Sequence, residues 1–391
     1  MTLIDKCGVF GSTDFLPLWS LRNFPLTEML GPFNSDISGY DLDLVVSMPH
    51  GHVQLGRRLD PLTLYAPSNY QYRTSATIER GGTHFFETFV KDFVGGQRFN
   101  SLVDIGGNDL AVARNLSYLA ERVTVVDPVC EPEHGQRVDG VHVVGRSIES
   151  VELNREEYQP DIVICRHTME HLASPSDVIS QLMSQSKKNC LFFIEVPDLE
   201  SLLESLRLDA VFHQHLHYFD LWSISAMISM CGGEVLEHRY NRAGPCGGSL
   251  AVVFRSSTSH DQNLKFIRPN VGSFVDGIQR RVRQFRNQMD LMAELLNELP
   301  KPVYGYGASL MLSSLAFHLG TGFEMLHCVL DDDETKDGLT YQNVPVSVSW
   351  TGNESVPAEA SFVVTSLENV RPIFQRICSL QPRRIVVPIC N

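Results

Sequence analysis

Short apolar runs alternate with helical patterns over most of this chain, and this alternation constrains its fold more than any other feature. In the central part the runs are residues 101–105, 123–126, 141–144, 162–165 and 191–195. Strands that alternate with helices need crossover connections, which build a parallel sheet covered by helices. We therefore expect an α/β protein with a parallel sheet in its central part.

A second α/β pattern follows the first. Residues 271–299 carry apolar side chains at helical spacing, and Pro300 and Pro302 end this predicted helix. Beyond them lie predicted strands at 303–307, 328–331, 362–364 and 385–387, with helices over 309–319 and 371–379. The first 85 residues are instead rich in turns. A chain of 391 residues is long enough for two or three domains, and we place three, over residues 1–85, 86–265 and 266–391.

The strongest local signal is a glycine turn after the first central strand. The strand carries Asp104 and runs into Gly106-Gly107-Asn108-Asp109, and the next strand ends in Asp127-Pro128. Such a turn lets the backbone approach a ligand, and an acid about 20 residues later can hold a ribose. The turn is not a GxGxxG motif, and Asp104 would repel a phosphate. These details favour S-adenosylmethionine over a dinucleotide, with a glycine turn that serves only packing as the remaining alternative.

Two later segments are rich in histidine. His167 and His171 follow the strand 162–165, at the sheet edge where open α/β sheets place their ligands. A single loop histidine such as His171 is more often structural. In the second segment, His213, His215 and His217 occupy every second position. They are candidates for a catalytic base, a structural cluster or a metal site, and the base is favoured because an imidazole titrates near neutrality.

Charge and cysteine usage limit the partners. The chain has 32 basic and 46 acidic side chains and a net charge of −14, which disfavours nucleic acid and anionic membranes but not a small phosphate-bearing ligand. No run approaches the roughly 18 apolar residues of a membrane span. The first residues show no basic leader, and nine scattered cysteines do not form a disulfide framework. We expect a cytoplasmic protein with a small-molecule substrate.

Taken in order, the motifs resemble those of the sugar C-methyltransferases that act on nucleotide-linked 4-keto-deoxyhexoses. The matching segments are residues 70–75, 106–109, His171, 194–197, 213–219, 247–250, 305–308, Asp331 and 336–338. The resemblance spans nearly the whole chain. It implies a small N-terminal zinc domain, a central Rossmann-like class I methyltransferase domain that binds S-adenosylmethionine, and a C-terminal α/β domain that binds the substrate.

The resemblance also implies roles for individual residues. His215 would remove a proton from the acceptor carbon, His171 and Tyr72 would polarise or orient the acceptor, and Gln214 completes the catalytic set. The cofactor residues would be Asp104, Gly106, Gly107, Asn108, Asp109, Asp127, Pro128 and His167. The substrate residues would be His213, Tyr218, Gly248, Ser249, Tyr306 and Lys336. We expect the pKa of His215 to lie near its ordinary value of about 6.5.

The chain departs from the family pattern at two places. Of the two CxxC pairs that bind zinc in the family, Cys7 alone remains, with Phe10 opposite it and Ser47-Met48-Pro49-His50 in place of the second pair. Cys7 and His50, with His52 as a third candidate, could hold a metal weakly but do not make a closed four-ligand site, so we expect the fold to persist without zinc. In the active-site run, Phe212 and Gln214 stand where the family has a tyrosine and a glutamate. Ala251 and Ser309 replace two further basic residues.

The favoured function is methyl transfer from S-adenosylmethionine to a carbon next to a ketone of a nucleotide-linked sugar. One rival keeps the cofactor and methylates oxygen or nitrogen of another small molecule. A second is a non-catalytic paralogue that binds the cofactor or a nucleotide sugar. A third is a metal-dependent enzyme built on His213, His215 and His217.

Overall fold

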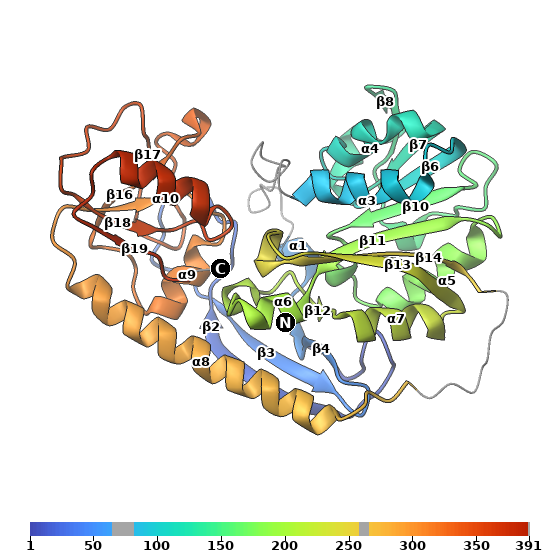
Figure 1. Ribbon diagram of the computed structural model, residues 1–391, viewed down its shortest axis with the longest axis horizontal. Coiled ribbons are helices and arrows are strands. Elements are labelled where there is room, and N and C mark those ends of the chain that lie inside the picture. Colours follow the sequence, from blue (N-terminus) through green and yellow to red (C-terminus); the bar gives the residue numbers. More distant parts are fainter. Residues whose placement is uncertain (65–81, 258–265, 390–391) are drawn as a thin grey trace.

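The computed structural model describes residues 1–64, 82–257 and 266–389, which form three main β-sheets with helices packed around them (Figure 1). A small antiparallel pair, β1 (Thr2–Leu3) with β5 (Arg57–Arg58), and a short helix, α1 (Pro61–Leu64), complete the N-terminal part. No helix among these described residues is long and apolar enough to cross a membrane.

The central sheet has eight strands in the order β13-β14-β11-β10-β6-β7-β9-β8. They are β6 (Phe99–Ile105), β7 (Ala120–Val126), β8 (Arg137–Val138), β9 (Val141–Val144), β10 (Ile162–Arg166), β11 (Leu191–Pro197), β13 (Gly233–Asn241) and β14 (Ser249–Ser256). The five strands from β9 to β11 run parallel, and β14 is antiparallel to both its neighbours. The short edge strand β8 is also antiparallel to its neighbour β9. Apart from β8, this order, with the reversed strand β14 inserted near the edge, is that of the class I methyltransferase fold, as expected.

Helices cover both faces of the central sheet. They are α3 (His84–Val94) and α4 (Ala111–Asn115) on one face, and α5 (Pro175–Gln185) and α7 (Leu221–Met230) on the other. Neighbouring residues of one strand accordingly enter different cores: Phe192 packs with α5 and α7, whereas Phe193 packs with α3. A strand buried on both faces reads as a continuous apolar run, which is why the five parallel strands could be predicted. The antiparallel strands β8 and β14 and the edge strand β13 were not predicted.

The N-terminal sheet is antiparallel and contains β2 (Phe15–Phe24), β3 (Tyr40–Ser47) and β4 (His52–Leu55). Its fourth strand, β12 (His217–Tyr218), comes from the histidine-rich segment and pairs with β4. The first part of the chain is therefore fastened to the loop that carries the candidate catalytic histidines. Turn-rich sequence alone did not predict this sheet.

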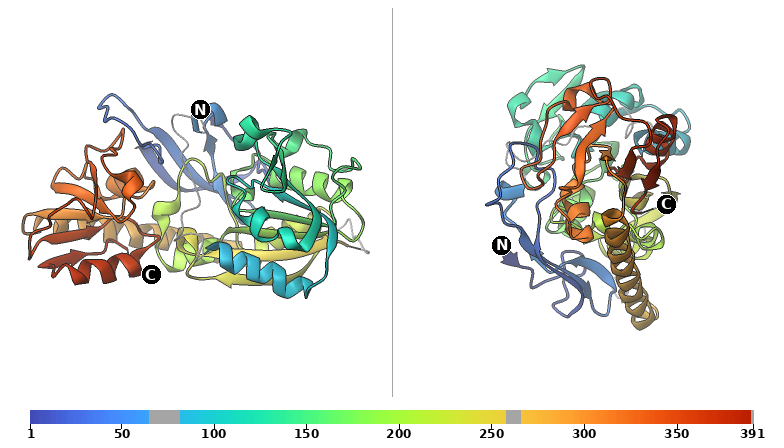
Figure 2. Two further views of the ribbon diagram at one scale, coloured as in Figure 1. Left: turned by 90° about the horizontal axis from the view of Figure 1, so that it is seen from above. Right: turned by 90° about the vertical axis from the view of Figure 1, so that its left-hand side faces the viewer.

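The C-terminal part begins with a long helix, α8 (Val271–Asn297), which lies along β2 and α9 (Figures 1 and 2). A parallel sheet follows, in the order β17-β16-β15-β18-β19. Its elements are β15 (Val303–Tyr306), α9 (Leu312–Leu319), β16 (Leu326–Asp331), β17 (Val348–Trp350), β18 (Ser361–Val364), α10 (Val370–Ser379) and β19 (Arg384–Val386). The strand order reverses between β15 and β18, and open α/β sheets bind ligands at such a reversal.

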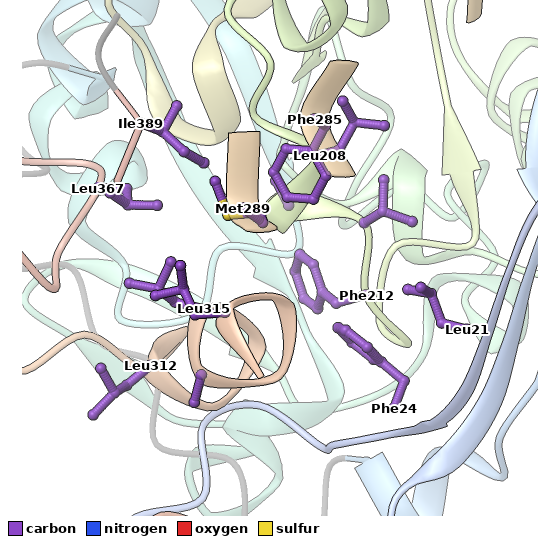
Figure 3. Close-up of a cluster of buried hydrophobic side chains, with 14 of the residues drawn as sticks. Leu21, Phe24, Leu208, Phe212, Phe285, Met289, Leu312, Leu315, Leu367 and Ile389 are labelled. Atoms are coloured by element: carbon purple, nitrogen blue, oxygen red, sulfur yellow. The ribbon is translucent and has the colours of Figure 1, made fainter. Parts of the chain in front are cut away.

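One apolar core joins the three parts (Figure 3). Phe24 from β2, Phe212 from the central part, Phe285 from α8 and Leu312 from α9 converge in it. Shorter helical segments complete the described chain: α6 (Leu199–Glu204) and single turns at Ser117–Leu119, Pro128–Glu133, Ile148–Ser150, Met169–His171, Leu208–Ala210, Pro245–Gly247 and Glu334–Lys336. Because the three parts share this core, it fixes how they are placed relative to one another.

Candidate active site

The glycine turn lies at the carboxyl end of β6. Gly106 has a φ of +75°, and a side chain there would collide with Thr168. A Cβ at Gly107 would lie 2.8 Å from Val125 and 2.9 Å from the Asp104 carboxylate. Packing therefore requires glycine at both positions, and this requirement by itself does not specify a ligand.

Asp104 is the residue at this turn whose surroundings point to a ligand. Its side chain is 2% exposed, and its Oδ2 has no hydrogen-bond partner among the described residues. Burial, reinforced by the nearby carboxylate of Asp127, raises the pKa of Asp104 to about 8. A buried carboxyl without a partner is costly, and an ammonium group would relieve that cost. The amino-acid end of S-adenosylmethionine carries such an ammonium, so the residues present fit this cofactor.

Asp127 closes the same turn from the end of β7. Its Oδ2 accepts a hydrogen bond from the Asn108 amide at 2.8 Å, and its Oδ1 accepts one from Val129, just after Pro128, also at 2.8 Å. Burial raises the pKa of Asp127, while these two hydrogen bonds oppose the shift. Each oxygen keeps lone pairs for ribose hydroxyls. Asp109 accepts a hydrogen bond from the first residue of α4, at 3.3 Å. The predicted cofactor residues of β6 and β7 thus lie together.

The loop after β10 packs directly against the glycine turn. Thr168 donates its hydroxyl to the Ile105 carbonyl at 3.3 Å. His167 has a φ of +47°, and its Nδ1 lies 3.3 Å from Oε1 of Glu170. Burial lowers the pKa of His167 to about 4, so its ring is neutral near pH 7. This loop therefore places neutral imidazoles beside the turn assigned to the cofactor.

His171 and His215 meet at this loop. Their ring centroids are 4.9 Å apart, and one side-chain ligand atom from each, together with one from Glu170, falls within 4.8 Å. Nδ1 of His171 donates to the Gln214 carbonyl at 2.8 Å, which leaves Nε2 as the acceptor nitrogen, 4.0 Å from Oε1 of Glu170. The two histidines that the resemblance assigns to catalysis are thus adjacent, although 44 positions separate them in the chain.

Burial keeps the two histidine rings of this cluster neutral near pH 7. It lowers the pKa of His215 well below its usual range, and the neighbouring His171 lowers it further. The expectation that His215 titrates near its ordinary value is therefore wrong. Burial also lowers the pKa of His171 and raises that of Glu170 to about 7. At neutral pH both rings are unprotonated and can accept a proton, and Glu170 can become the carboxylate that offsets a new positive charge.

Glu170 is a site residue that sequence reasoning missed. It is fully buried, and its Oε2 has no partner among the described residues. The available signal was its position next to His171, in a strand-end loop at the ligand edge of the sheet. Glu195 is a second residue near the site that sequence reasoning did not assign. Its carboxylate accepts hydrogen bonds from Arg166 at 2.6 Å and from Ser249 at 2.5 Å, and its backbone carbonyl accepts one from the His167 amide at 2.8 Å.

The three alternating histidines do not converge. His213 lies 3.3 Å from the Phe24 carbonyl, and His217 pairs with His52 through ring nitrogens 3.0 Å apart. Only His215 reaches His171. The alternative of a metal centre built on His213, His215 and His217 is therefore wrong, because alternate positions here face different neighbours. Within the described residues, the one group spaced for a metal ion is Glu170, His171 and His215.

The remaining predicted residues of the central part contact neighbouring segments of the fold. Tyr218 is buried, and its hydroxyl accepts a hydrogen bond from the Phe212 amide at 3.3 Å. Gly248 has a φ of +142°, and a Cβ there would meet Ser201. Tyr72 lies outside the described residues.

Tyr306 is the last residue of β15, and Lys336 lies in the loop after β16. The Tyr306 hydroxyl donates to Asp332 at 2.8 Å, and Nζ of Lys336 donates to Asp331 at 3.0 Å and to the Ala308 carbonyl at 3.2 Å. They are thus placed around the loop after β15, apart from the histidine cluster.

In the N-terminal part, the residues at the positions of the family's zinc ligands contact other side chains and backbone groups. The Phe10 ring stacks on His50 with centroids 4.7 Å apart, and the Cys7 sulfur accepts a hydrogen bond from the Phe10 amide at 3.4 Å. His52 is engaged by His217. Cys7, His50 and His52 do not form a metal-spaced group in the part of the chain that the structure describes, so these residues do not fit a zinc ion.

Comparison with known proteins finds a matching family model and a relative that spans most of the chain. Residues 75–238 match the family model described as a methyltransferase domain. The chain is 25% identical over 365 residues to a protein named C-methyltransferase NovU from Streptomyces niveus, and the match covers 88% of this chain and 85% of that protein.

Two solved structures are similar to part of this chain. A Burkholderia thailandensis 1,6-didemethyltoxoflavin-N1-methyltransferase with bound S-adenosylhomocysteine is 12% identical, covers 59% of this chain and 99% of its own, and has a TM-score of 0.40. The magnesium protoporphyrin IX methyltransferase of Synechocystis PCC 6803 is 13% identical, covers 48% of this chain and 90% of its own, and has a TM-score of 0.36.

Proposed function

We propose that this chain, an S-adenosylmethionine-dependent methyltransferase, methylates a carbon next to a ketone of a nucleotide-linked keto-deoxysugar. The methyltransferase assignment follows from the order of the central sheet and the matching family domain. One observation carries the finer proposal. A pair of neutral imidazoles, His171 and His215, lies with the buried carboxyl of Glu170 beside the cofactor turn.

The cofactor would be held by residues of two strand ends. Asp104 would pair with its ammonium group, the backbone of Gly106 and Gly107 would lie against it, and Asp127 would accept ribose hydroxyls. S-adenosylmethionine supplies a methyl group already activated by its sulfonium. The main task left to the protein is to position the acceptor and to generate its nucleophile.

His215 would accept the proton of the acceptor carbon. Hydrogens next to a ketone are acidic, and their removal yields an enolate that attacks the methyl carbon. A lowered pKa keeps His215 neutral and ready to accept. The same low pKa makes its protonated form unstable, so the proton transfer needs a compensating negative charge. Glu170, the buried carboxyl nearest to the pair, can provide it through His171.

The C-terminal sheet would bind the nucleotide. Its strand order reverses between β15 and β18, and the loop after β15 contains Gly307 with a φ of +97°. The C-methyltransferase relative matches across 88% of the chain, a length that must include much of this part. Lys336 and Tyr306 lie around the loop and would contact the nucleotide.

The test is product analysis with a thymidine-diphosphate-linked 4-keto-6-deoxyhexose as the probe. The protein is incubated with probe and methyl-labelled S-adenosylmethionine, and the position of the label is read by NMR. We expect the label on a carbon next to the ketone. Label on oxygen or nitrogen would support the rival methyltransferases. Binding of the probe without any product would support a non-catalytic paralogue.

A further inference from the structure

Gln214 joins the catalytic histidines to the N-terminal part of the chain. Its backbone carbonyl accepts the Nδ1–H of His171 at 2.8 Å. Its side-chain Oε1 accepts the Thr27 hydroxyl at 3.2 Å, and its Nε2 donates to Oε2 of Glu28 at 3.3 Å. Thr27, Glu28 and Gln214 are all buried. One residue thus holds the catalytic tautomer with its backbone and is itself held through its side chain.

Thr27 and Glu28 belong to a segment that is bonded to the C-terminal part. The Glu28 amide donates to the Leu310 carbonyl at 2.8 Å, in the loop that follows the proposed nucleotide turn. Further bonds within the same segment join Ser313 to Leu26 at 3.0 Å, Asn343 to Leu26 at 2.8 Å, Gln342 to Met29 at 2.9 Å and Thr340 to Gly31 at 2.7 Å. Glu28 is therefore placed by the C-terminal part while its carboxyl contacts the catalytic loop.

The backbone conformation and the burial of Glu28 are both unfavourable for a glutamate. Glu28 has a φ of +64°, a left-handed conformation that is uncommon for glutamate, and only 9% of it is exposed. Burial raises the pKa of its carboxyl to about 7, and the hydrogen bond from Gln214 partly opposes this. Residues with such costs persist where the surrounding structure holds them in place, and they cluster at functional sites.

We propose that Thr27 and Glu28 act as a clamp on Gln214, which sets the orientation of His171 and His215. The proposal rests on the proposed function for its effect on turnover, whereas its geometric part does not depend on the acceptor. Glu28 acts through Gln214 and is a positioning residue.

Three variants test the clamp. Glu28→Ala removes the acceptor for Gln214, and Glu28→Gln keeps an oxygen in the same place. Ser313→Ala removes a bond from the same segment to the C-terminal part without touching Gln214, and serves as the control. We expect Glu28→Ala to lower kcat on the sugar probe about tenfold, the value of one lost hydrogen bond. We expect Glu28→Gln to recover most of that loss, and Ser313→Ala to match the wild type.

The kcat values of the three variants decide whether the clamp exists. Unaltered kcat in Glu28→Ala overturns the clamp. An equal loss in Ser313→Ala also overturns it, because the segment would then act only as a connection between parts. No recovery in Glu28→Gln would contradict a role through the hydrogen bond to Gln214. Calorimetric binding of S-adenosylhomocysteine, expected to be unchanged in all three, shows that the variants are folded.

A second readout works without turnover. Nitrogen-15 spectra of the histidine rings, with His171 assigned by its absence in His171→Asn, report which nitrogen carries the proton. We expect His171 in the wild type to be protonated on Nδ1, and Glu28→Ala to show a mixture of tautomers. If the wild type does not methylate the probe, the proposed function fails, and these spectra still decide the clamp. Identical spectra for wild type and Glu28→Ala would overturn it.

Discussion

The carboxylate of Asp331 accepts a hydrogen bond from the Ala308 amide at 2.7 Å. Asp127 makes the same contact with the Asn108 amide at 2.8 Å. In both parallel sheets, an acid at or just after the end of the second strand holds the turn that follows the first strand. The chain therefore carries the same local arrangement twice, once at the turn proposed for the cofactor and once at the turn proposed for the nucleotide.

Cofactor affinity should depend on the charge of Asp104. Its pKa is raised to about 8, so it is mostly protonated at pH 6 and must ionise to pair with an ammonium. We expect affinity for S-adenosylhomocysteine, measured by calorimetry, to rise from pH 6 to pH 8. Asp104→Asn should weaken binding at pH 8 by about tenfold or more, as for a lost charge-assisted hydrogen bond, and should remove the pH dependence. A variant that keeps the pH dependence would refute this assignment.

Catalysis should depend on the ionisation of Glu170. Its pKa is raised to about 7, so the carboxylate that offsets a protonated histidine forms as the pH rises through 7. We expect kcat of the wild type to increase between pH 6 and pH 8. Glu170→Gln, which preserves the shape of the side chain, should lower kcat at pH 8 and flatten this limb of the profile. An unchanged profile would exclude Glu170 from proton transfer.

The histidine cluster should work without a metal ion. Glu170, His171 and His215 are spaced closely enough to bind one, yet a metal would occupy the lone pair with which His215 takes a proton. We expect activity to survive dialysis against a chelator, with metal content measured by elemental analysis. Loss of activity that added zinc or manganese restores would reassign the cluster as a metal centre.

Stability should depend on a buried ion cluster between the central and C-terminal parts. Arg207 is 2% exposed and binds Asp209 at 2.8 Å and Glu368 at 2.8 Å. Arg207→Ala leaves two uncompensated carboxylates and should cost about 3–5 kcal/mol in denaturant unfolding. Arg155→Ala is the control, because its pair with Glu152 is exposed and should contribute little. Similar losses in both variants would contradict the importance of this cluster.

The parallel strands β6, β7, β9, β10 and β11 and the strands β15, β16 and β18 could be predicted because they are short apolar runs that the fold largely buries. Strands β8, β13, β14 and β17 were not predicted. The N-terminal sheet could not be predicted, since its strands alternate irregularly and its edge strand comes from His217 and Tyr218. In the site, His171 and His215 were identified by resemblance. The residues around these histidines could not be predicted, because Glu28 lies 186 positions from Gln214 in the chain. The pKa of His215 could not be predicted either, because it depends on burial in the packed core.

The most direct test of the account is hydrogen exchange at the acceptor carbon. The wild type and His215→Asn are each incubated in deuterated water with the sugar probe and S-adenosylhomocysteine, so that proton removal is measured without methyl transfer. We predict that the wild type exchanges the hydrogen next to the ketone. His215→Asn should be slower by at least about 100-fold, the scale of general-base catalysis, while binding S-adenosylhomocysteine normally. Exchange at the wild-type rate in His215→Asn would show that His215 is not the base.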